Sequence, residues 1–325
     1  MKTLRVVVVG VGNMGQNHVR VFQRFPNVKV VAVVDADRAR AKMIAEKFDI
    51  PQYYTDLKLC LKTEKPDAAS VAVPPPVSAR TAVIVIDAGV HVLVEKPVGM
   101  TVAEVKRVAD RAKKAGVIVA AGYTEHFNPA VWTARQVVKK GMLGDVRYVR
   151  AQRIGVPTPQ MGNVNAILDI GVHDIEVFNS LTGSKPTRVH AAGRSVFSKA
   201  VDIATVTLQY KDTLAQIELN KIAPFKKRTL EIFGTKGLLE VDYMLQSVTY
   251  YPPQHVEKTT DFEELVLKYG LRPQSVGIGV TVQEPLQLEL EDFIKAVRTK
   301  RAPQVTIQQA AAILETALQA VKALR

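Results

Sequence analysis

The feature that most constrains this chain is a glycine-rich turn that directly follows an apolar strand near the N-terminus. Residues 4–9 are largely apolar and β-branched, and Gly10, Gly12 and Gly15 come next with G-x-G-x-x-G spacing. The first glycine permits a tight turn, the second lets the backbone approach a pyrophosphate, and the third allows close helix–strand packing. A helix that starts near Asn13 directs its N–H groups and positive dipole end toward phosphates. The pattern predicts a dinucleotide-binding strand–turn–helix.

Asp35 ends the next apolar strand, which spans residues 28–34. A carboxylate in this position accepts hydrogen bonds from the adenosine ribose, and it repels the 2′-phosphate that distinguishes NADP from NAD. Arg38 and Arg40 follow closely, and either side chain could instead bind that phosphate. We therefore expect NAD as the cofactor, with NADP as the alternative. A purely structural role of the glycines in a tight turn does not account for an acid in this register.

Length and composition limit the class of protein. At 325 residues the chain has room for two domains, and its hydrophobic content of 47% is ordinary for a globular protein. Cys60 is its one cysteine, which excludes an intrachain disulfide and a thiolate metal cluster. We find neither a signal-peptide pattern nor an apolar run of bilayer length. These observations predict a cytoplasmic protein without a membrane partner.

The formal net charge of +13 is spread over the whole chain. Residues 1–122 carry 19 Lys and Arg against 11 Asp and Glu, and the remaining residues carry 25 against 20. Nucleic-acid-binding proteins usually concentrate their charge in a patch or a recognisable module, and the sequence shows neither. We expect no nucleic-acid partner, whereas a diffuse positive field would attract anionic cofactors and substrates.

Strands and helices alternate strictly through the first 122 residues. The predicted strands span 4–9, 28–34, 67–73, 90–94 and 117–121, and helices are predicted near 14–25, 37–48, 77–89 and 101–115. Short β-branched strands of this kind suit a parallel sheet that is covered on both faces. Right-handed crossovers between them give a doubly wound α/β fold. We therefore assign residues 1–122 to a Rossmann domain.

The pattern changes after residue 122. Helices are predicted near 129–140 and 169–182. Alternating strands are predicted near 146–155, 187–197, 203–210, 213–220, 228–233, 237–242 and 246–251. Alternation of apolar and polar residues predicts a large, open, mostly antiparallel sheet with one solvated face. Two amphipathic helices near 286–299 and 306–323 complete a second α+β domain, residues 123–325. These helices could pack back on the Rossmann domain.

Lys96 follows the apolar strand at residues 90–94, in the sequence Glu95-Lys96-Pro97. Ligands of doubly wound sheets collect at the carboxyl ends of the strands, so this lysine is expected at the cofactor crevice. There its cation could bind a substrate oxygen or polarise a hydroxyl. An exposed lysine before a proline turn is the structural alternative. The bond to Pro97 could be cis, as X–Pro bonds tolerate.

A second group of polar residues is Asp169-Ile170-Gly171-Val172-His173-Asp174. On a helix, Asp169 and His173 share one face because they are four residues apart. A carboxylate beside a histidine suits a general base near neutral pH. Two alternatives remain open. These side chains could bind a metal with ligands from elsewhere, or Asp169 could cap an ordinary helix.

Taken together, Gly10 to Gly15, Glu95-Lys96-Pro97 and the Asp169…His173 pair resemble the glucose-fructose oxidoreductase/inositol dehydrogenase (Gfo/Idh/MocA) family over essentially the whole chain. The resemblance implies a Rossmann domain followed by an α/β domain whose open sheet often forms a subunit interface. It therefore implies a homo-oligomer, dimer or tetramer. It also implies that Lys96, Asp169 and His173 are catalytic, and we assign no metal site.

Residues 126–131, residues 169–175 and Asn220-Lys221 with the basic run 226–228 further resemble the UDP-N-acetylglucosamine 3-dehydrogenase branch of that family. The cofactor contacts that we assign are Gly10, Gly12, Asn13, Met14, Gly15, Asp35, Arg38, Pro74, Glu95 and Lys96. The substrate contacts that we assign are Tyr123, Asn128, Arg153, Lys221 and Lys227, with the cationic three expected at a nucleotide diphosphate. The expected reaction is hydride transfer between a sugar carbinol and nicotinamide.

The chain departs from the branch at one place and from the wider family at two. His126 stands where the branch has arginine, Pro74-Pro75-Pro76 with Ala79 replaces a Thr-Pro pattern that ends in histidine, and Glu176 replaces an aspartate. Two other functions therefore stay open. One is a dehydrogenase of free polyols or aldoses, and the other is a non-catalytic dinucleotide-binding sensor. The sensor is disfavoured because binding alone requires none of the three catalytic residues.

Overall fold

A computed structural model describes residues 2–157, 164–197, 199–253, 261–263 and 274–324. The chain divides into two units. Unit 1 comprises residues 1–127 and 283–315, and unit 2 comprises residues 128–282 and 316–325. Helix α10 (Ile307–Ala323) contains the last of the three boundaries between them. Within the described ranges, no helix is both long enough and apolar enough to cross a membrane.

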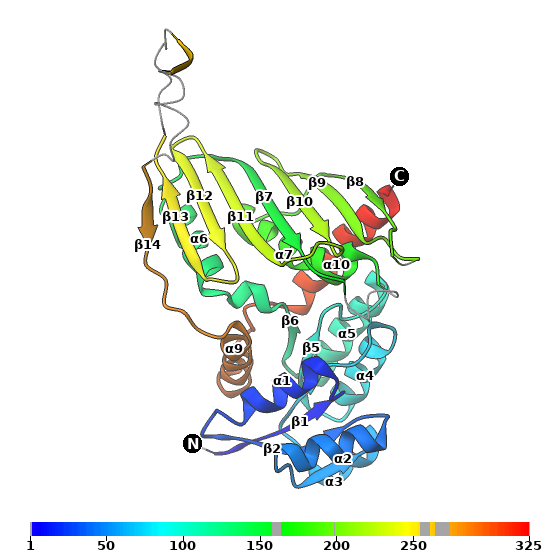
Figure 1. The fold of residues 1–325 in the computed structure, drawn as a ribbon. Coiled ribbons are helices and arrows are strands. Elements are labelled where there is room, and N and C mark those ends of the chain that lie inside the picture. The colour runs from blue at the N-terminus through cyan, green and yellow to red at the C-terminus, as the bar shows by residue number, and fades with distance from the viewer. Residues whose placement is uncertain (1, 158–163, 198, 254–260, 264–273, 325) are drawn as a thin grey trace. The chain divides into compact units, whose positions relative to one another are not determined.

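Unit 1 is built on a six-stranded parallel sheet with the order β3-β2-β1-β4-β5-β6. Its strands are β1 (Leu4–Val9), β2 (Val28–Val34), β3 (Gln52–Tyr54), β4 (Ala68–Val71), β5 (His91–Glu95) and β6 (Val119–Gly122). Its helices are α1 (Asn13–Phe22), α2 (Arg38–Lys47), α3 (Leu57–Glu64), α4 (Pro75–Asp87), α5 (Val102–Ala115), the 3₁₀ helix η1 (Thr124–Phe127) and α9 (Pro285–Thr299). Helices α4 and α5 lie on one side of the sheet, and α1 and α9 lie on the other (Figure 1). The predicted doubly wound fold is confirmed.

The core of unit 1 combines distant parts of the sequence. Valines of β1 and β2 are almost fully buried, and Leu290 and Phe293 of α9 belong to the same apolar cluster. Glu284, which precedes α9, pairs with Arg20 of α1 and with Arg24 just after that helix. The hydrogen bond from Arg20 lowers the pKa of the Glu284 carboxyl. The apolar cluster and this ionic contact together attach α9 to the N-terminal sheet.

Within residues 1–122, strand β3 and helix α3 were not predicted from the sequence. Strand β3 is three residues long, which is too short for a clear alternation pattern. Residues 57–62 of α3 alternate leucine with lysine or cysteine in a period of two, which is typical of a strand. The helix is instead started by Asp56, whose side chain accepts hydrogen bonds from the N–H groups of Lys58 and Leu59.

Unit 2 is built on an eight-stranded sheet with the order β14-β13-β12-β11-β7-β10-β9-β8. Its strands are β7 (Val146–Ile154), β8 (Arg188–Arg194), β9 (Ile203–Gln209), β10 (Leu214–Asn220), β11 (Lys227–Gly234), β12 (Gly237–Asp242), β13 (Ser247–Tyr251) and β14 (Val276–Ile278). Its helices are α6 (Pro129–Lys139), a π-helical turn η3 (Ile167–Gly171) and α7 (Val172–Thr182). Neighbouring strands run antiparallel except β7 and β10, so the predicted mostly antiparallel sheet is confirmed.

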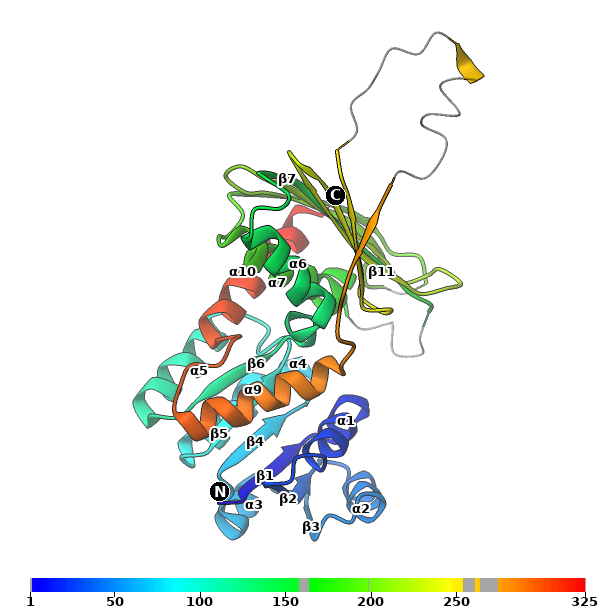
Figure 2. The ribbon, with the colours of Figure 1, turned by 90° about the vertical axis from the view of Figure 1, so that its left-hand side faces the viewer.

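The two faces of this sheet differ in chemistry. Helices α6 and α7 lie on one face, where Val149, Ala151 and Arg153 of β7 are buried (Figure 2). The other face carries half-buried polar side chains in pairs across strands. Arg150 pairs with Glu231, and the Gln152 amide donates to Glu218 over 2.7 Å. The face with the helices therefore supplies the core, and the polar face is solvated in the single chain.

Candidate active site

The glycine-rich loop of unit 1 has the geometry that its spacing predicts. Gly10 adopts a φ of +82°, in the left-handed region that favours glycine. A Cβ on Gly15 would collide with the carbonyl oxygen of Gly10, so helix α1 can approach the loop only with glycine there. A Cβ on Gly12 would meet no atom within 4 Å. The loop thus faces open space beside the uncapped N-terminus of α1, which fits a pyrophosphate.

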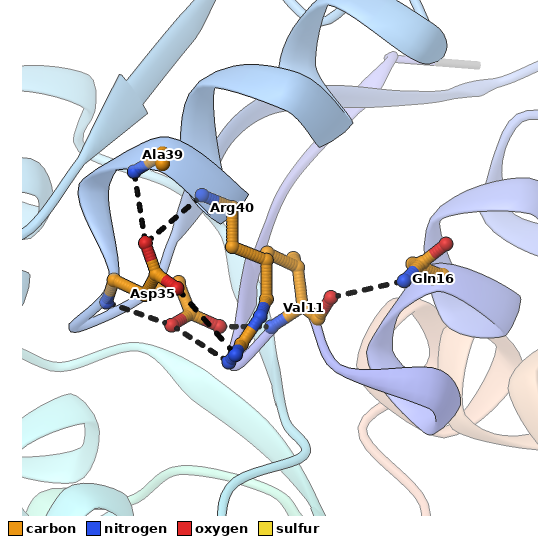
Figure 3. Close-up of polar contacts among 6 residues, drawn as sticks. Val11, Gln16, Asp35, Ala39 and Arg40 are labelled. Carbon is orange, nitrogen blue, oxygen red and sulfur yellow. Dashed lines mark hydrogen bonds and ion pairs between the residues drawn. The ribbon is translucent and has the colours of Figure 1, made fainter.

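Asp35, at the end of β2, organises this loop from the side (Figure 3). Its Oδ2 accepts the Val11 N–H over 2.9 Å, and its Oδ1 accepts the Asp37 N–H over 2.9 Å. The guanidinium of Arg40 lies 3.5 Å from Oδ1. Arg38, which we assigned from the sequence, lies exposed on the same helix. Arg40 is therefore the arginine beside the carboxylate that would face the ribose.

This position leads to a prediction about cofactor choice. Arg40→Ala is expected to weaken NADP binding by about 10–100-fold, because it removes a charge-assisted hydrogen bond to the 2′-phosphate. NAD binding should change by less than about threefold, because Asp35 remains. Fluorescence titration with NADPH and NADH measures both dissociation constants. Arg38→Ala is the matched control, and an equal loss for both cofactors in Arg40→Ala would contradict the assignment.

The other predicted residues of unit 1 lie where β4, β5 and β6 end. Pro74 precedes α4 at the carboxyl end of β4, and Lys96 follows β5. The Lys96–Pro97 peptide bond is cis. Lys96 is half-buried and Tyr123, after β6, is only 1% exposed. Because all these strands are parallel, Gly10, Pro74 and Lys96 share one edge of the sheet.

In unit 2, Asp169 and His173 lie in consecutive helical turns of different type. Asp169 is in the π-helical turn η3, and His173 is the second residue of α7. Asp169 lies inside this helical segment, and Asn165, ahead of it, accepts the Ile167 N–H with its side chain over 2.9 Å. The alternative in which Asp169 serves as an N-cap is therefore wrong. π-helical turns occur frequently at functional sites.

Lys221 fixes the Asp169 carboxylate. Its ammonium group lies 3.0 Å from Asp169 Oδ2 and 3.3 Å from the carbonyl oxygen of Val164. Lys221 is 8% exposed, and it follows directly on β10. Gly171 lets the turn pack against the same strand, because a Cβ there would lie 2.9 Å from Leu219 Cδ1. Lys221 thus holds the π-helical turn on the end of β10.

Asp174, the neighbour of His173, is fully buried beneath the turn. Its Oδ2 accepts from Arg153 Nε over 2.6 Å, and its Oδ1 accepts from the Tyr243 hydroxyl over 3.1 Å. The Arg153 guanidinium also stacks over the Tyr243 ring at 4.9 Å. These contacts engage the Asp174 carboxylate, which the metal alternative would have used. Among the described residues, no group of three or more His, Cys, Asp or Glu is placed to hold a metal ion.

The remaining predicted substrate residues differ in accessibility. Asn128 is 2% exposed, caps α6 through the Ala130 N–H and donates to the Tyr243 carbonyl oxygen. Arg153 is 3% exposed, whereas Lys227 lies exposed at the start of β11. Arg135 was not among the residues predicted from the sequence. Burial lowers the pKa of its guanidinium, and the Glu176 carboxylate opposes that effect.

Comparison with known proteins identifies the family. The profile of the GFO_IDH_MocA oxidoreductase family, NAD-binding Rossmann fold, matches residues 4–123, and that of the GFO/IDH/MocA C-terminal domain matches residues 131–240. The chain belongs to the Gfo/Idh/MocA family. It is therefore an oxidoreductase with an NAD-binding Rossmann fold, as its glycine loop and Asp35 predict.

The relatives of this Gfo/Idh/MocA oxidoreductase carry names with different substrates. It is 25% identical over 300 residues to UDP-N-acetylglucosamine 3-dehydrogenase of Acidithiobacillus ferrooxidans, covering 92% of this chain and 90% of the relative. It is 31% identical over 250 residues to human trans-1,2-dihydrobenzene-1,2-diol dehydrogenase, covering 73% and 74%. The solved structure of UDP-N-acetylglucosamine 3-dehydrogenase GnnA from Acidithiobacillus ferrooxidans matches with a TM-score of 0.87 at 24% identity. The match covers 100% of this chain and 98% of that chain.

Proposed function

We propose that this oxidoreductase transfers a hydride between a secondary hydroxyl carbon of a nucleotide sugar and NAD. The observation that carries the proposal is the Asp169–Lys221 ion pair, which fixes an acid one turn before His173. A protein that only binds a dinucleotide has no need of a buried lysine on an acid in its second unit. Similarity to UDP-N-acetylglucosamine 3-dehydrogenase over 92% of the chain supports a nucleotide sugar.

The proposed chemistry divides among three side chains. His173 takes the proton of the hydroxyl as the hydride leaves its carbon, so that a carbonyl forms. Lys96 donates to the same oxygen and stabilises the negative charge that develops on it. Asp169 orients the sugar or His173. The glycine loop and Asp35 would hold NAD, which would supply the hydride acceptor.

Lys221 is predicted to act through Asp169. Lys221→Met keeps the length of the side chain but removes the ammonium group that holds the carboxylate and the Val164 carbonyl. A charge-assisted hydrogen bond contributes about 1.5–3 kcal/mol, so we expect kcat/KM for the sugar to fall by about tenfold or more. Steady-state kinetics checks this, with Lys226→Met as an exposed control on the following segment. Wild-type kcat/KM in Lys221→Met would remove the residue from the site.

The diphosphate is better assigned to Lys227 than to the other predicted cations. Lys227 is exposed, whereas Arg153 is held by a buried carboxylate and Lys221 by Asp169. Moving either of the two engaged cations to a phosphate would leave an acid without its partner. Our proposal therefore keeps Lys227 as diphosphate ligand. It assigns Asn128 to helix capping and leaves Tyr123 buried near the end of β6.

A dehydrogenase of small diols or free sugars is the second candidate. It is favoured by the 31% identity to a protein named for a dihydrodiol, a substrate without a diphosphate. Absorbance at 340 nm, with NAD or NADP and a panel of UDP-sugars, free polyols and aldoses, separates the two. Turnover of UDP-N-acetylglucosamine alone supports the first proposal, and turnover of free diols supports the second. Dinucleotide binding without any turnover would favour the sensor.

We further propose that unit 2 carries the substrate and the subunit contacts. The polar face of its sheet presents ion pairs and hydrogen bonds that a second copy of the chain could bury, including Arg150–Glu231 and Tyr148–Gln216. A homodimer or tetramer through this face is expected. Sedimentation velocity of the wild type and of Arg150→Glu tests it, because the reversed charge opposes Glu231.

A further inference from the structure

A chain of three polar side chains crosses the buried centre of unit 1. His18 of α1 and Ser70 of β4 are both 0% exposed, and the His18 Nδ1 lies 2.6 Å from the Ser70 Oγ. On the other side of the ring, Nε2 lies 3.0 Å from Oε1 of Glu95, at the end of β5. Helix α1 carries the phosphate loop at its start, and β5 leads into Lys96. The three residues therefore join the cofactor helix to the segment of Lys96.

Glu95 transmits this contact to Lys96. Its second oxygen, Oε2, accepts the backbone N–H of Lys96 over 3.2 Å. Gly122 of β6 makes room for the carboxylate, because a Cβ there would lie 3.1 Å from Glu95 Cδ. A carboxylate only accepts, so Nε2 of His18 is the donor and Nδ1 faces the Ser70 hydroxyl. One oxygen of Glu95 is thus held by His18, and the other holds the backbone at Lys96.

The surroundings of Glu95 make this hydrogen bond from His18 important. Glu289 of α9 is 2% exposed, and its Oε2 accepts from Thr124 Oγ1 over 3.4 Å. Burial and the neighbouring Glu95 carboxylate raise the pKa of Glu289 well above its ordinary value. Glu289 is itself a carboxyl group, so it supplies no positive charge to balance Glu95. Among the side chains whose contacts the structure describes, His18 is the donor on Glu95 Oε1.

Such a group of buried polar side chains is costly for stability. Each loses its hydration, and apolar residues of similar size would pack in the same place without that cost. A stabilising role alone therefore explains the group poorly. We infer that His18 is a positioning residue, which fixes the Glu95 carboxylate and through it the backbone that carries Lys96. This inference rests on the proposed function in so far as Lys96 is catalytic.

Two substitutions at one position separate this role from ordinary packing. His18→Gln can place its amide N–H₂ where Nε2 lies and keep the hydrogen bond to Glu95. His18→Asn can reach only the position of Nδ1, so it keeps the contact with Ser70 and loses Glu95. Both remove the ring and part of its volume, so packing predicts similar losses of stability. If His18 positions Lys96, only His18→Asn should lower the catalytic rate that depends on Lys96.

Kinetics and thermal unfolding of both variants give the first result. We expect kcat to fall at least tenfold in His18→Asn and to stay within about threefold in His18→Gln. The melting temperatures should fall by similar amounts, and the KM for NAD should stay within twofold. Equal kcat values in the two variants would overturn the inference. Should His18→Asn not fold, Glu95→Gln keeps the size of the acid and should show the same loss; wild-type kcat there would also overturn it.

A second measurement needs no sugar, so it still decides if the proposed substrate is wrong. Trace acetylation with acetic anhydride, followed by mass spectrometry, reports how accessible and reactive the Lys96 amine is. We expect labelling of half-buried Lys96 to rise at least threefold in His18→Asn and not in His18→Gln. Exposed Lys42 is the internal reference. Unchanged Lys96 labelling in both variants would overturn the inference, whereas a rise in Asn alone without turnover would fault the proposed substrate only.

Discussion

Replacing His173 by alanine is expected to lower kcat by about 10²–10⁴-fold, the usual effect of losing a general base. The imidazole is the group that we propose for the hydroxyl proton, and alanine leaves that proton without an acceptor. Binding of NADH should stay intact, because the glycine loop and Asp35 belong to unit 1. Steady-state kinetics on the identified substrate, together with NADH fluorescence titration, checks both parts.

The control for this prediction is His190→Ala. His190 lies exposed on β8 in the same unit, so its loss removes an imidazole without touching the π-helical turn. We expect its kcat to match the wild type. A His173→Ala enzyme with unchanged kcat would exclude the residue as the base. A loss confined to KM would assign it to binding instead.

Asp174→Ala is expected to lower the free energy of unfolding by about 3–5 kcal/mol, the range measured when one partner of a buried ion pair is removed. Arg153 is 3% exposed and Tyr243 is 3% exposed, so neither can turn to water easily. The substitution leaves a buried guanidinium without its carboxylate and removes the acceptor of the Tyr243 hydroxyl. Denaturant unfolding followed by circular dichroism measures the loss.

An exposed ion pair provides the comparison. Asp145 pairs with Arg147, and their side chains are 72% and 56% exposed. Such surface pairs contribute at most about 1 kcal/mol, so Asp145→Ala should unfold almost as the wild type does. The double variant Arg153→Met/Asp174→Leu should recover much of the loss, because it removes both buried charges. An Asp174→Ala protein as stable as Asp145→Ala would show that the buried pair does not stabilise unit 2.

The parts of the site that were predictable depend on short stretches of chain. Gly10 and Gly15 are required by a turn whose close contacts lie within the loop and at β4. Asp35 follows a strand whose apolar pattern is visible without the fold. The order of strands and helices in residues 1–122 followed from the same local patterns. Only β3 and α3 were missed, because one is very short and the other alternates like a strand.

The partners of the charged residues could not be predicted from spacing alone. From the sequence, either Arg38 or Arg40 could bind the 2′-phosphate of NADP. In the structure, the direction of helix α2 places Arg40 beside Asp35. Lys221 is 52 residues from Asp169, and the register of β10 brings them together. From the sequence, Arg153 and Lys221 were assigned to a nucleotide diphosphate. In the structure, Arg153 pairs with the Asp174 carboxylate and Lys221 pairs with the Asp169 carboxylate.

The family, the doubly wound first sheet and the glycine loop for a dinucleotide were all predictable from the amino-acid sequence. They follow from local periodicity and from the backbone freedom of glycine, which act over a few residues. The partner of each acidic side chain, in contrast, follows from how distant segments pack. His18 and Glu95 lie 77 positions apart, and their contact depends on how α1 crosses the sheet. Packing brings buried charged side chains together in pairs, because a buried charge without a partner would destabilise the fold.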